Sequence, residues 1–146
     1  MKINAKTVYD FIPYVSIDRF KQLEYIKIDN DGIVATDSHK LLFKEKKSNL
    51  KNPQYIKAKE FCEVFKKVDK EVETETKENI NFPDWEQVIP KGDPCFSIKL
   101  NPKILIECTN TFKNEKFINM EFYGEEKPVK ITKGDNDFII LMPLKK

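Results

Sequence analysis

The chain has 146 residues, with 26 basic and 24 acidic side chains, so its formal net charge is only +2. This balance does not suggest a protein that coats nucleic acid by bulk charge. An apolar fraction of 40% predicts a folded core rather than disorder. No stretch approaches the roughly 20 apolar residues of a membrane span. Three cysteines without paired spacing predict free thiols, so we expect a cytoplasmic protein without membrane association.

The first segment of the chain predicts a strand, a short helix and a hairpin. Residues 2–4 read as a strand, and apolar residues then recur at helical spacing from Val8 to Val15. Pro13 is expected to end or kink that helix. Asn30-Asp31-Gly32 predicts a hairpin turn, because Asp-Gly tolerates positive φ. The strands around and after this turn are expected at 23–29, 33–36 and 41–44.

The middle segment predicts the clearest helix, at 58–70, after a polar connection and a short strand at 55–57. Its apolar residues recur at i, i+3, i+4 and i+7 and form one face. These residues are Phe61, Val64, Phe65 and Val68. A strand is expected at 72–76, and 79–94 reads as an irregular linker because it is rich in Pro, Asp and Asn.

The last segment predicts a strand at 96–100, a helix that begins at Asn101-Pro102, and three closing strands. Asn is a good capping residue and Pro suits the first helical position. The closing strands are expected at 118–123, 129–132 and 138–144, with turns at Gly124 and at 134–136. The residues of this helix expected to face the core are Ile104, Leu105, Cys108 and Phe112.

These elements predict an α+β fold with helices on one face of antiparallel sheets. We expect a single compact domain over 1–146, built from strand–helix–strand repeats near 1–50, 54–94 and 95–146. Five apolar residues on the predicted helices should be buried. They are Phe61, Val64, Phe65, Leu105 and Phe112.

Three short strings carry the strongest functional signal. They are Ala35-Thr36-Asp37-Ser38-His39-Lys40-Leu41, Phe82-Pro83-Asp84-Trp85-Glu86-Gln87-Val88-Ile89-Pro90 and the terminal Ile140-Leu141-Met142-Pro143-Leu144-Lys145-Lys146. Together and in this order they resemble the bacterial DNA polymerase sliding clamp, the β processivity subunit. That family carries an ATDGHRLA-like string, then FPDYRRVLP, then a C-terminal MPMRL. Its fold repeats strand–helix–strand–strand–strand units, and its three strings wall one pocket for short linear peptides.

The resemblance implies a peptide-binding pocket assembled from all three strings. The residues that it places there are Thr36, Ser38, His39, Lys40, Leu41, Pro83, Val88, Ile140, Met142, Pro143 and Leu144. This chain departs from the family at Ser38, where the family usually has Gly. A side chain there is expected to narrow the groove or to remove a positive-φ conformation. Lys40 in place of Arg keeps the charge but loses the planar fork.

Each string also has a simpler interpretation. Asp37, Ser38 and His39 are neighbours, and neighbouring side chains on a strand point apart, so a hydrolase triad is disfavoured against a polar turn. Phe82 and Trp85 are expected to cover the core. The tail also fits an ordinary edge strand that Pro143 and its lysines protect from further pairing.

The lysines of the predicted 58–70 helix have two interpretations. They form either a solvated face or a surface for sequence-independent, salt-sensitive contact with DNA phosphates inside a ring. These lysines are Lys59, Lys66, Lys67 and Lys70. Glu60 and Glu63 dilute this patch.

We expect no metal, no cofactor and no enzymatic activity, because no metal-ligand spacing and no phosphate-binding Gly loop is visible. The sequence favours a sliding-clamp-like processivity factor that binds peptides of a DNA polymerase or repair protein. Encirclement of double-stranded DNA by so short a chain requires a homo-oligomer. The alternative is an adaptor or decoy that binds such peptides without encircling DNA.

Overall fold

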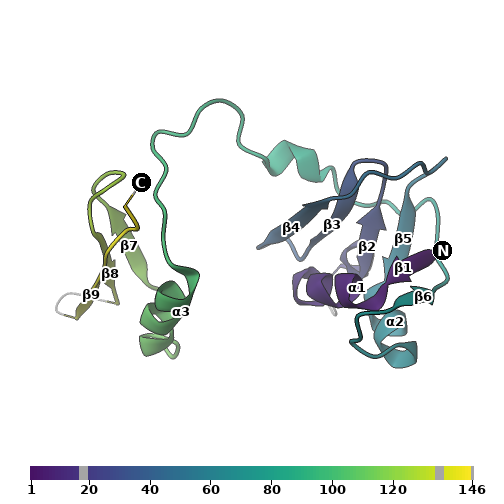
Figure 1. Cartoon of the computed structure of the whole chain (residues 1–146), viewed down its shortest axis with the longest axis horizontal. Helices are drawn as coiled ribbons and strands as arrows, with labels where there is room; N and C mark the ends of the chain where they lie inside the picture. Colours follow the sequence, from purple (N-terminus) through teal and green to yellow (C-terminus); the bar gives the residue numbers. More distant parts are fainter. Residues whose placement is uncertain (17–19, 134–136, 146) are drawn as a thin grey trace. The chain divides into compact units, whose positions relative to one another are not determined.

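The computed structural model describes residues 1–16, 20–133 and 137–145. It divides the chain into two compact units, Met1–Ile89 and Pro90–Lys146, where the sequence predicted one domain (Figure 1). Each unit is described by itself. The turn predicted at 134–136 lies outside the described residues.

The first unit contains six strands, two α-helices and three 3₁₀ helices within the described residues. Its elements in chain order are β1 (Lys2–Asn4), α1 (Ala5–Phe11), η1 (Ile12–Tyr14), η2 (Lys21–Glu24), β2 (Tyr25–Ile28), β3 (Gly32–Thr36), β4 (Leu41–Glu45), β5 (Gln54–Lys57), α2 (Ala58–Val64), β6 (Glu71–Glu73) and η3 (Trp85–Val88). Strands β4, β3, β2 and β5 form an antiparallel sheet in that order, and β1 pairs with β6.

Strand register separates the two faces of the four-stranded sheet. Ile28 lies opposite Ile33, and both belong to the buried core together with Val8 and Phe11 of α1 and Phe61 of α2. Strand residues alternate between faces. The opposite, outer face therefore carries the intervening residues, which include Tyr25, Lys27, Val34, Thr36, Leu41, Phe43 and Tyr55.

Helix α1 forms and ends for local reasons. The side chain of Asn4 accepts a hydrogen bond from the Thr7 N–H at 3.2 Å, which caps the first turn. Pro13 lies in η1, and the chain becomes extended at Val15. The prediction that Pro13 ends the helix is consistent with this geometry.

Helix α2 is shorter than predicted, because it ends at Val64 instead of residue 70. The N–H of Ala5 donates to the carbonyl of Lys70 at 2.9 Å, and the N–H of Lys6 donates to Val68 at 3.0 Å. These bonds hold the segment after α2 beside the start of α1 rather than in helical geometry. The predicted burial of Val64 is wrong, since its side chain is 73% exposed, whereas Phe61 is buried and Phe65 half-buried.

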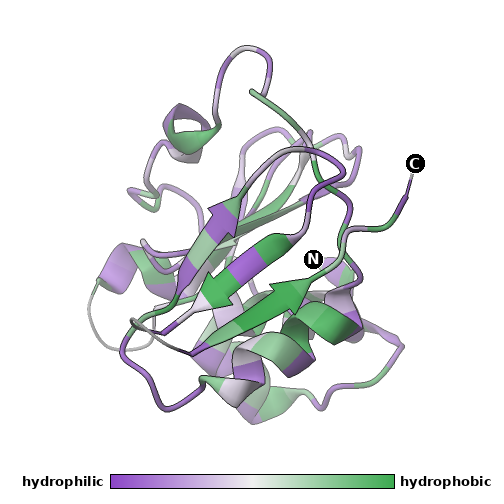
Figure 2. Ribbon diagram, turned by 90° about the vertical axis from the view of Figure 1, so that its left-hand side faces the viewer, coloured by the Kyte–Doolittle hydropathy of each residue, from purple (hydrophilic) through white to green (hydrophobic). Residues whose placement is uncertain are grey.

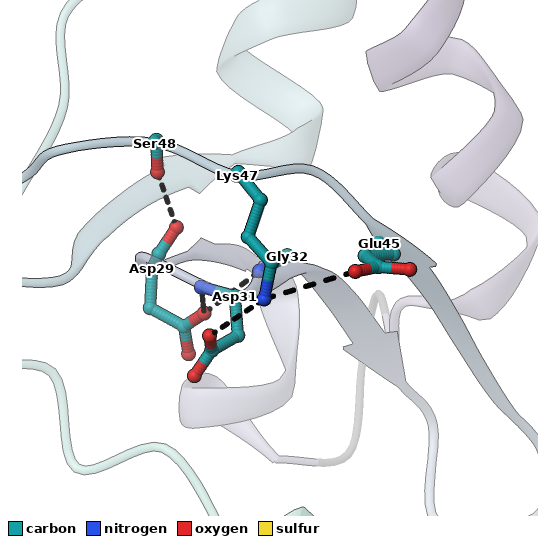
Figure 3. A network of polar contacts seen from close by, with 6 residues as sticks. All are labelled: Asp29, Asp31, Gly32, Glu45, Lys47 and Ser48. Atoms are coloured by element: carbon teal, nitrogen blue, oxygen red, sulfur yellow. Dashed lines mark hydrogen bonds and ion pairs between the residues drawn. The ribbon is translucent and has the colours of Figure 1, made fainter.

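The turn between β2 and β3 is held by side chains rather than by a positive-φ glycine. The Asp29 carboxylate accepts hydrogen bonds from the N–H groups of Asp31 and Gly32, both at 3.1 Å (Figure 3). Ser48 donates to the Asp29 carbonyl at 2.6 Å, and Lys47 pairs with Asp31 at 3.3 Å. Gly32 does not have positive φ, so the expected reason for a glycine is wrong.

The second unit contains α3 (Pro102–Thr111) and an antiparallel sheet in the order β7 (Asn119–Phe122), β8 (Val129–Thr132), β9 (Phe138–Leu141). The side chain of Asn101 accepts from the Lys103 N–H at 3.0 Å and caps α3 as expected. All four residues of β9 are apolar (Figure 2). The buried core of the unit is Phe112, Val129, Ile131 and Leu141.

Two expectations for the second unit are wrong. Residues 96–100 do not form a strand. Instead of a ladder of strand hydrogen bonds, the Lys99 carbonyl accepts one backbone hydrogen bond, from the Leu144 N–H at 2.8 Å. Leu105 and Cys108 are half-buried and pack on the core, while Ile104 is 45% exposed. Phe112 is buried as predicted.

The α+β class with antiparallel sheets is confirmed, since every strand pair in the described residues is antiparallel. Within that part of the chain, no helix is both long enough and apolar enough to cross a membrane.

Candidate peptide-binding site

The hairpin that joins β3 to β4 is built around Asp37. Its carboxylate accepts hydrogen bonds from the N–H groups of His39 at 2.9 Å and Lys40 at 3.0 Å. The bond from His39, followed by that from Lys40, lowers the pKa of Asp37 against the opposing effect of desolvation. Lys40 adds an ion pair at 3.6 Å. Asp37 therefore serves to shape the turn.

Ser38 adopts a positive-φ conformation, although it carries a side chain where the resembled family usually has glycine. Its φ is +75°, a left-handed conformation that costs a residue with a Cβ more than glycine. The hydroxyl of Thr36 accepts from the Ser38 N–H at 3.2 Å and donates to the Lys40 carbonyl at 2.9 Å. These local bonds hold the conformation, so the expectation that a side chain removes it is wrong.

The 80–89 segment lies on the outer face of the sheet and is attached through aromatic rings. Phe82 contacts Tyr55 of β5, with ring centroids 6.1 Å apart. Trp85 stacks on Phe43 of β4 at 5.0 Å and 20°. Since β5 and β4 are the two outer strands of the sheet, the segment crosses the sheet from one to the other.

Gly32 makes this attachment sterically feasible. A Cβ at Gly32 would lie 2.5 Å from the Phe43 ring and 2.6 Å from the Lys44 carbonyl oxygen. The Phe43 ring thus occupies the space that a side chain would fill, and it supports Trp85 from below. Glycine is required at position 32 because the Phe43 ring and the Lys44 carbonyl group lie too close to its Cα for a side chain.

A cavity of about 380 Å³ lies between the hairpin and the 80–89 segment. Its lining combines apolar side chains with polar and charged ones. The lining residues are Leu23, Thr36, Ser38, His39, Lys40, Leu41, Pro83, Asp84, Trp85 and Val88. The structure thus brings together every residue that the resemblance placed in the pocket from the first two strings.

Three lining residues were not among the predicted site residues. Leu23 lies in η2, where the sequence predicted the start of a strand, so its position could not be foreseen. Asp84 and Trp85 lie inside the second string but were assigned to the loop and the core. Trp85 is only 8% exposed, and its indole N–H has no hydrogen-bond partner among the described residues.

The third string belongs to the second unit. Ile140 lies in β9, and Met142, Pro143 and Leu144 follow it. The exposed fractions of Ile140, Met142 and Leu144 are 48%, 63% and 50%. Their role in the pocket stays a prediction.

The four lysines predicted to contact DNA do not share a helix. Lys59 lies in α2, whereas Lys66, Lys67 and Lys70 follow its end. All four are exposed. The prediction of one basic helical face is wrong, because the backbone of this segment pairs with the start of α1.

No group of three or more His, Cys, Asp or Glu side chains in the described ranges could hold a metal ion. The single histidine, His39, lies in the hairpin between β3 and β4, where it is exposed and lines the cavity.

Comparison with protein-family models, with curated proteins and with solved structures finds no match to this chain.

Proposed function

We propose that this chain is a clamp-like protein of DNA replication or repair that binds short linear peptides of a polymerase or another DNA-processing protein. The observation that carries the proposal is the cavity. Two strings that resemble the sliding clamp, at 36–41 and 83–88, are distant in sequence and line the same space. A small preformed groove is where a short peptide gains affinity by burying one or two apolar anchors.

The order of elements supports the same proposal. Residues 2–45 contain a strand, a helix and three strands, and residues 54–73 contain a strand, a helix and a strand. Residues 102–141 contain a helix followed by three strands. This order is compatible with one full clamp-like repeat and two abbreviated ones.

The chemistry of the lining suits an anchor with a polar neighbour. Leu23, Leu41 and Val88 offer aliphatic contact, while the hairpin offers hydroxyl, imidazole and ammonium groups. Trp85 contributes an aromatic side chain to the same lining.

Titration with a labelled clamp-binding peptide tests the proposal. Leu41→Ala removes apolar lining and should weaken binding by on the order of 1–2 kcal/mol. Val68→Ala is the matched control, because Val68 is an exposed apolar residue of the same unit outside the cavity. Equal affinity of the folded Leu41→Ala variant and the parent, with folding checked by circular dichroism, would contradict the proposal.

The contribution of the tail needs its own pair of variants. If the tail completes the pocket, Met142→Ala should weaken peptide binding by a similar amount. Ile106→Ala, an exposed apolar residue on α3, is the control in the same unit. A pocket formed by the first unit alone would leave both variants with parental affinity.

The adaptor that binds peptides without encircling DNA is the second candidate. The end of α2 at Val64 favours it, since three of the four lysines do not extend the helix that would face DNA. Native mass at several concentrations separates the candidates: a ring requires a stable oligomer. A monomer that retains peptide binding supports the adaptor.

A further inference from the structure

Strand β6 has one edge without a partner strand in the described part of the chain. On its paired edge, the Thr74 N–H donates to the Met1 carbonyl at 2.9 Å, and the N-terminal ammonium donates to the Thr74 carbonyl at 2.7 Å. Hydrogen-bonded and non-hydrogen-bonded pairs alternate along an antiparallel ladder. Glu71 and Glu73, which fall at the non-hydrogen-bonded positions, therefore direct their backbone N–H and C=O groups away from β1.

A cavity of about 350 Å³ lies beside this free edge. It opens because the chain after β6 meets β5 at a single bridge, Tyr55 to Lys77, and β5 then turns into α2 at Ala58. The lining comes from β5, from α2 and the residue after it, and from the end of β6 and the two residues after it. The lining residues are Ile56, Lys57, Glu60, Phe61, Val64, Phe65, Glu73, Thr74 and Glu75.

The cavity combines an apolar wall with an excess of acidic groups. Val64 is 73% exposed although it lies in a helix beside Phe61. Of the charged lining residues, Lys57 pairs with Glu60 at 3.1 Å, which leaves Glu73 and Glu75 without an ion-pair partner among the described residues. Two other positive groups lie beside this end of β6: the Met1 ammonium, which donates to the Thr74 carbonyl, and Lys2, which lies opposite Glu73 in the register.

We infer that the free edge of β6 binds an extended segment of a partner protein in which apolar residues alternate with lysine or arginine. Such a segment adds a strand through the backbone groups of Glu73. Its side chains alternate between faces, so apolar residues pack on Val64 and Phe65 while basic residues lie across from Glu73 and Glu75. Charge complementarity selects a basic segment over an acidic one.

This inference does not depend on the proposed function, because the two cavities share no lining residue. A labelled short peptide that alternates valine and lysine is the probe, and the same peptide with glutamate in place of lysine is its control. The lysine peptide should bind the full chain and the glutamate peptide should not. An excess of clamp-binding peptide should leave that binding unchanged.

Glu73→Pro is the sharpest variant. Proline removes the N–H that faces the cavity, and this N–H is not used in the ladder with β1. Loss of that hydrogen bond should lower the affinity for the lysine peptide on the order of tenfold. Glu71→Pro is the matched control: it makes the same change on the same edge but lies outside the cavity lining, so it should have a smaller effect.

The paired change Glu73→Gln with Glu75→Gln tests the charge. It keeps side-chain size, so binding should weaken several-fold and lose most of its salt dependence. The inference is overturned if the parent binds both peptides equally or neither, or if folded Glu73→Pro binds like the parent. A concentration-dependent dimer that Glu73→Pro abolishes, without any peptide binding, would assign the edge to a second copy and overturn the partner proposed here.

Discussion

The two units differ in how many faces of their sheets are covered. In the first unit, α1 and α2 pack on one face of the four-stranded sheet, and the 80–89 segment lies on the other. In the second unit, the core lies on one face, while Phe138 and Ile140 are 60% and 48% exposed on the other. The candidate cavity exists where a second layer covers the sheet.

This difference has an energetic consequence. The described core of the first unit extends over β1, α1, β2, β3, β5 and α2, whereas that of the second contains Phe112, Val129, Ile131 and Leu141. Small units bury a smaller fraction of their surface and are less stable alone. We therefore expect amide protons of β7–β9 to exchange faster than those of β2 and β3.

The largest predicted effect comes from the core of the first unit. Phe11 is fully buried against the sheet, so Phe11→Ala should lower the free energy of unfolding by about 3–5 kcal/mol. Phe112→Ala is the comparison in the second unit, where Phe112 is 8% exposed and lies in a smaller core. Chemical denaturation measures both. Equal losses would show that the smaller core packs as tightly as the larger one.

The next effect concerns the layer above the sheet. Gly32→Ala forces the Phe43 ring to move and should cost about 1–3 kcal/mol, with a shift in Trp85 fluorescence. Gly124→Ala, at φ +136° in the second unit, is strained without a comparable clash and should leave the fluorescence unchanged. If the folded Gly32→Ala variant has the same fluorescence as the parent, the position of Trp85 does not depend on the Phe43 ring.

Helix caps offer a smaller comparison between the units. Asn4→Ala removes the acceptor for Thr7, and Asn101→Ala removes the acceptor for Lys103. Each should cost about 1 kcal/mol. Hydrogen exchange resolved by residue should show the first loss in α1 and the second in α3. A loss that spreads over both units in either variant would mean that they unfold together.

Acid sensitivity is the smallest expected effect and belongs to the first unit. Burial raises the pKa of Asp29, but Lys27 at 3.0 Å and the N–H groups of Gly32 and Asp31 outweigh it, so the pKa lies below its usual value. A carboxylate with a lowered pKa stabilises the fold above about pH 4, and this contribution disappears as pH falls through the folded-state pKa. Asp29→Asn should therefore cost under about 1 kcal/mol at neutral pH, after solvent screening.

The pH profile of that variant provides the check. Its free energy of unfolding should depend less on pH than that of the parent between about pH 5 and pH 2. Lys47→Ala is a control, because Lys47 pairs with the exposed Asp31 and not with Asp29. A variant that loses stability equally at all pH values would assign the role of Asp29 to turn geometry alone.

Local patterns in the sequence determined most of the secondary structure. Helical spacing correctly predicted α1, and the cap at Asn101 correctly predicted the start of α3. Turn residues correctly placed β3, β4 and β8, because these signals act between residues close in the chain. The same local signals place 36–41 in a hairpin and 83–88 in an irregular segment.

Tertiary structure alone decided the rest. Helical propensity continues past Val64, but pairing of Val68 and Lys70 with the start of α1 ends the helix there. The role of Gly32 depends on Phe43, and the position of Trp85 depends on that same ring. The cavity forms where a distant segment crosses the outer face of the sheet, and such packing between residues far apart in the chain leaves no periodic signal in the sequence.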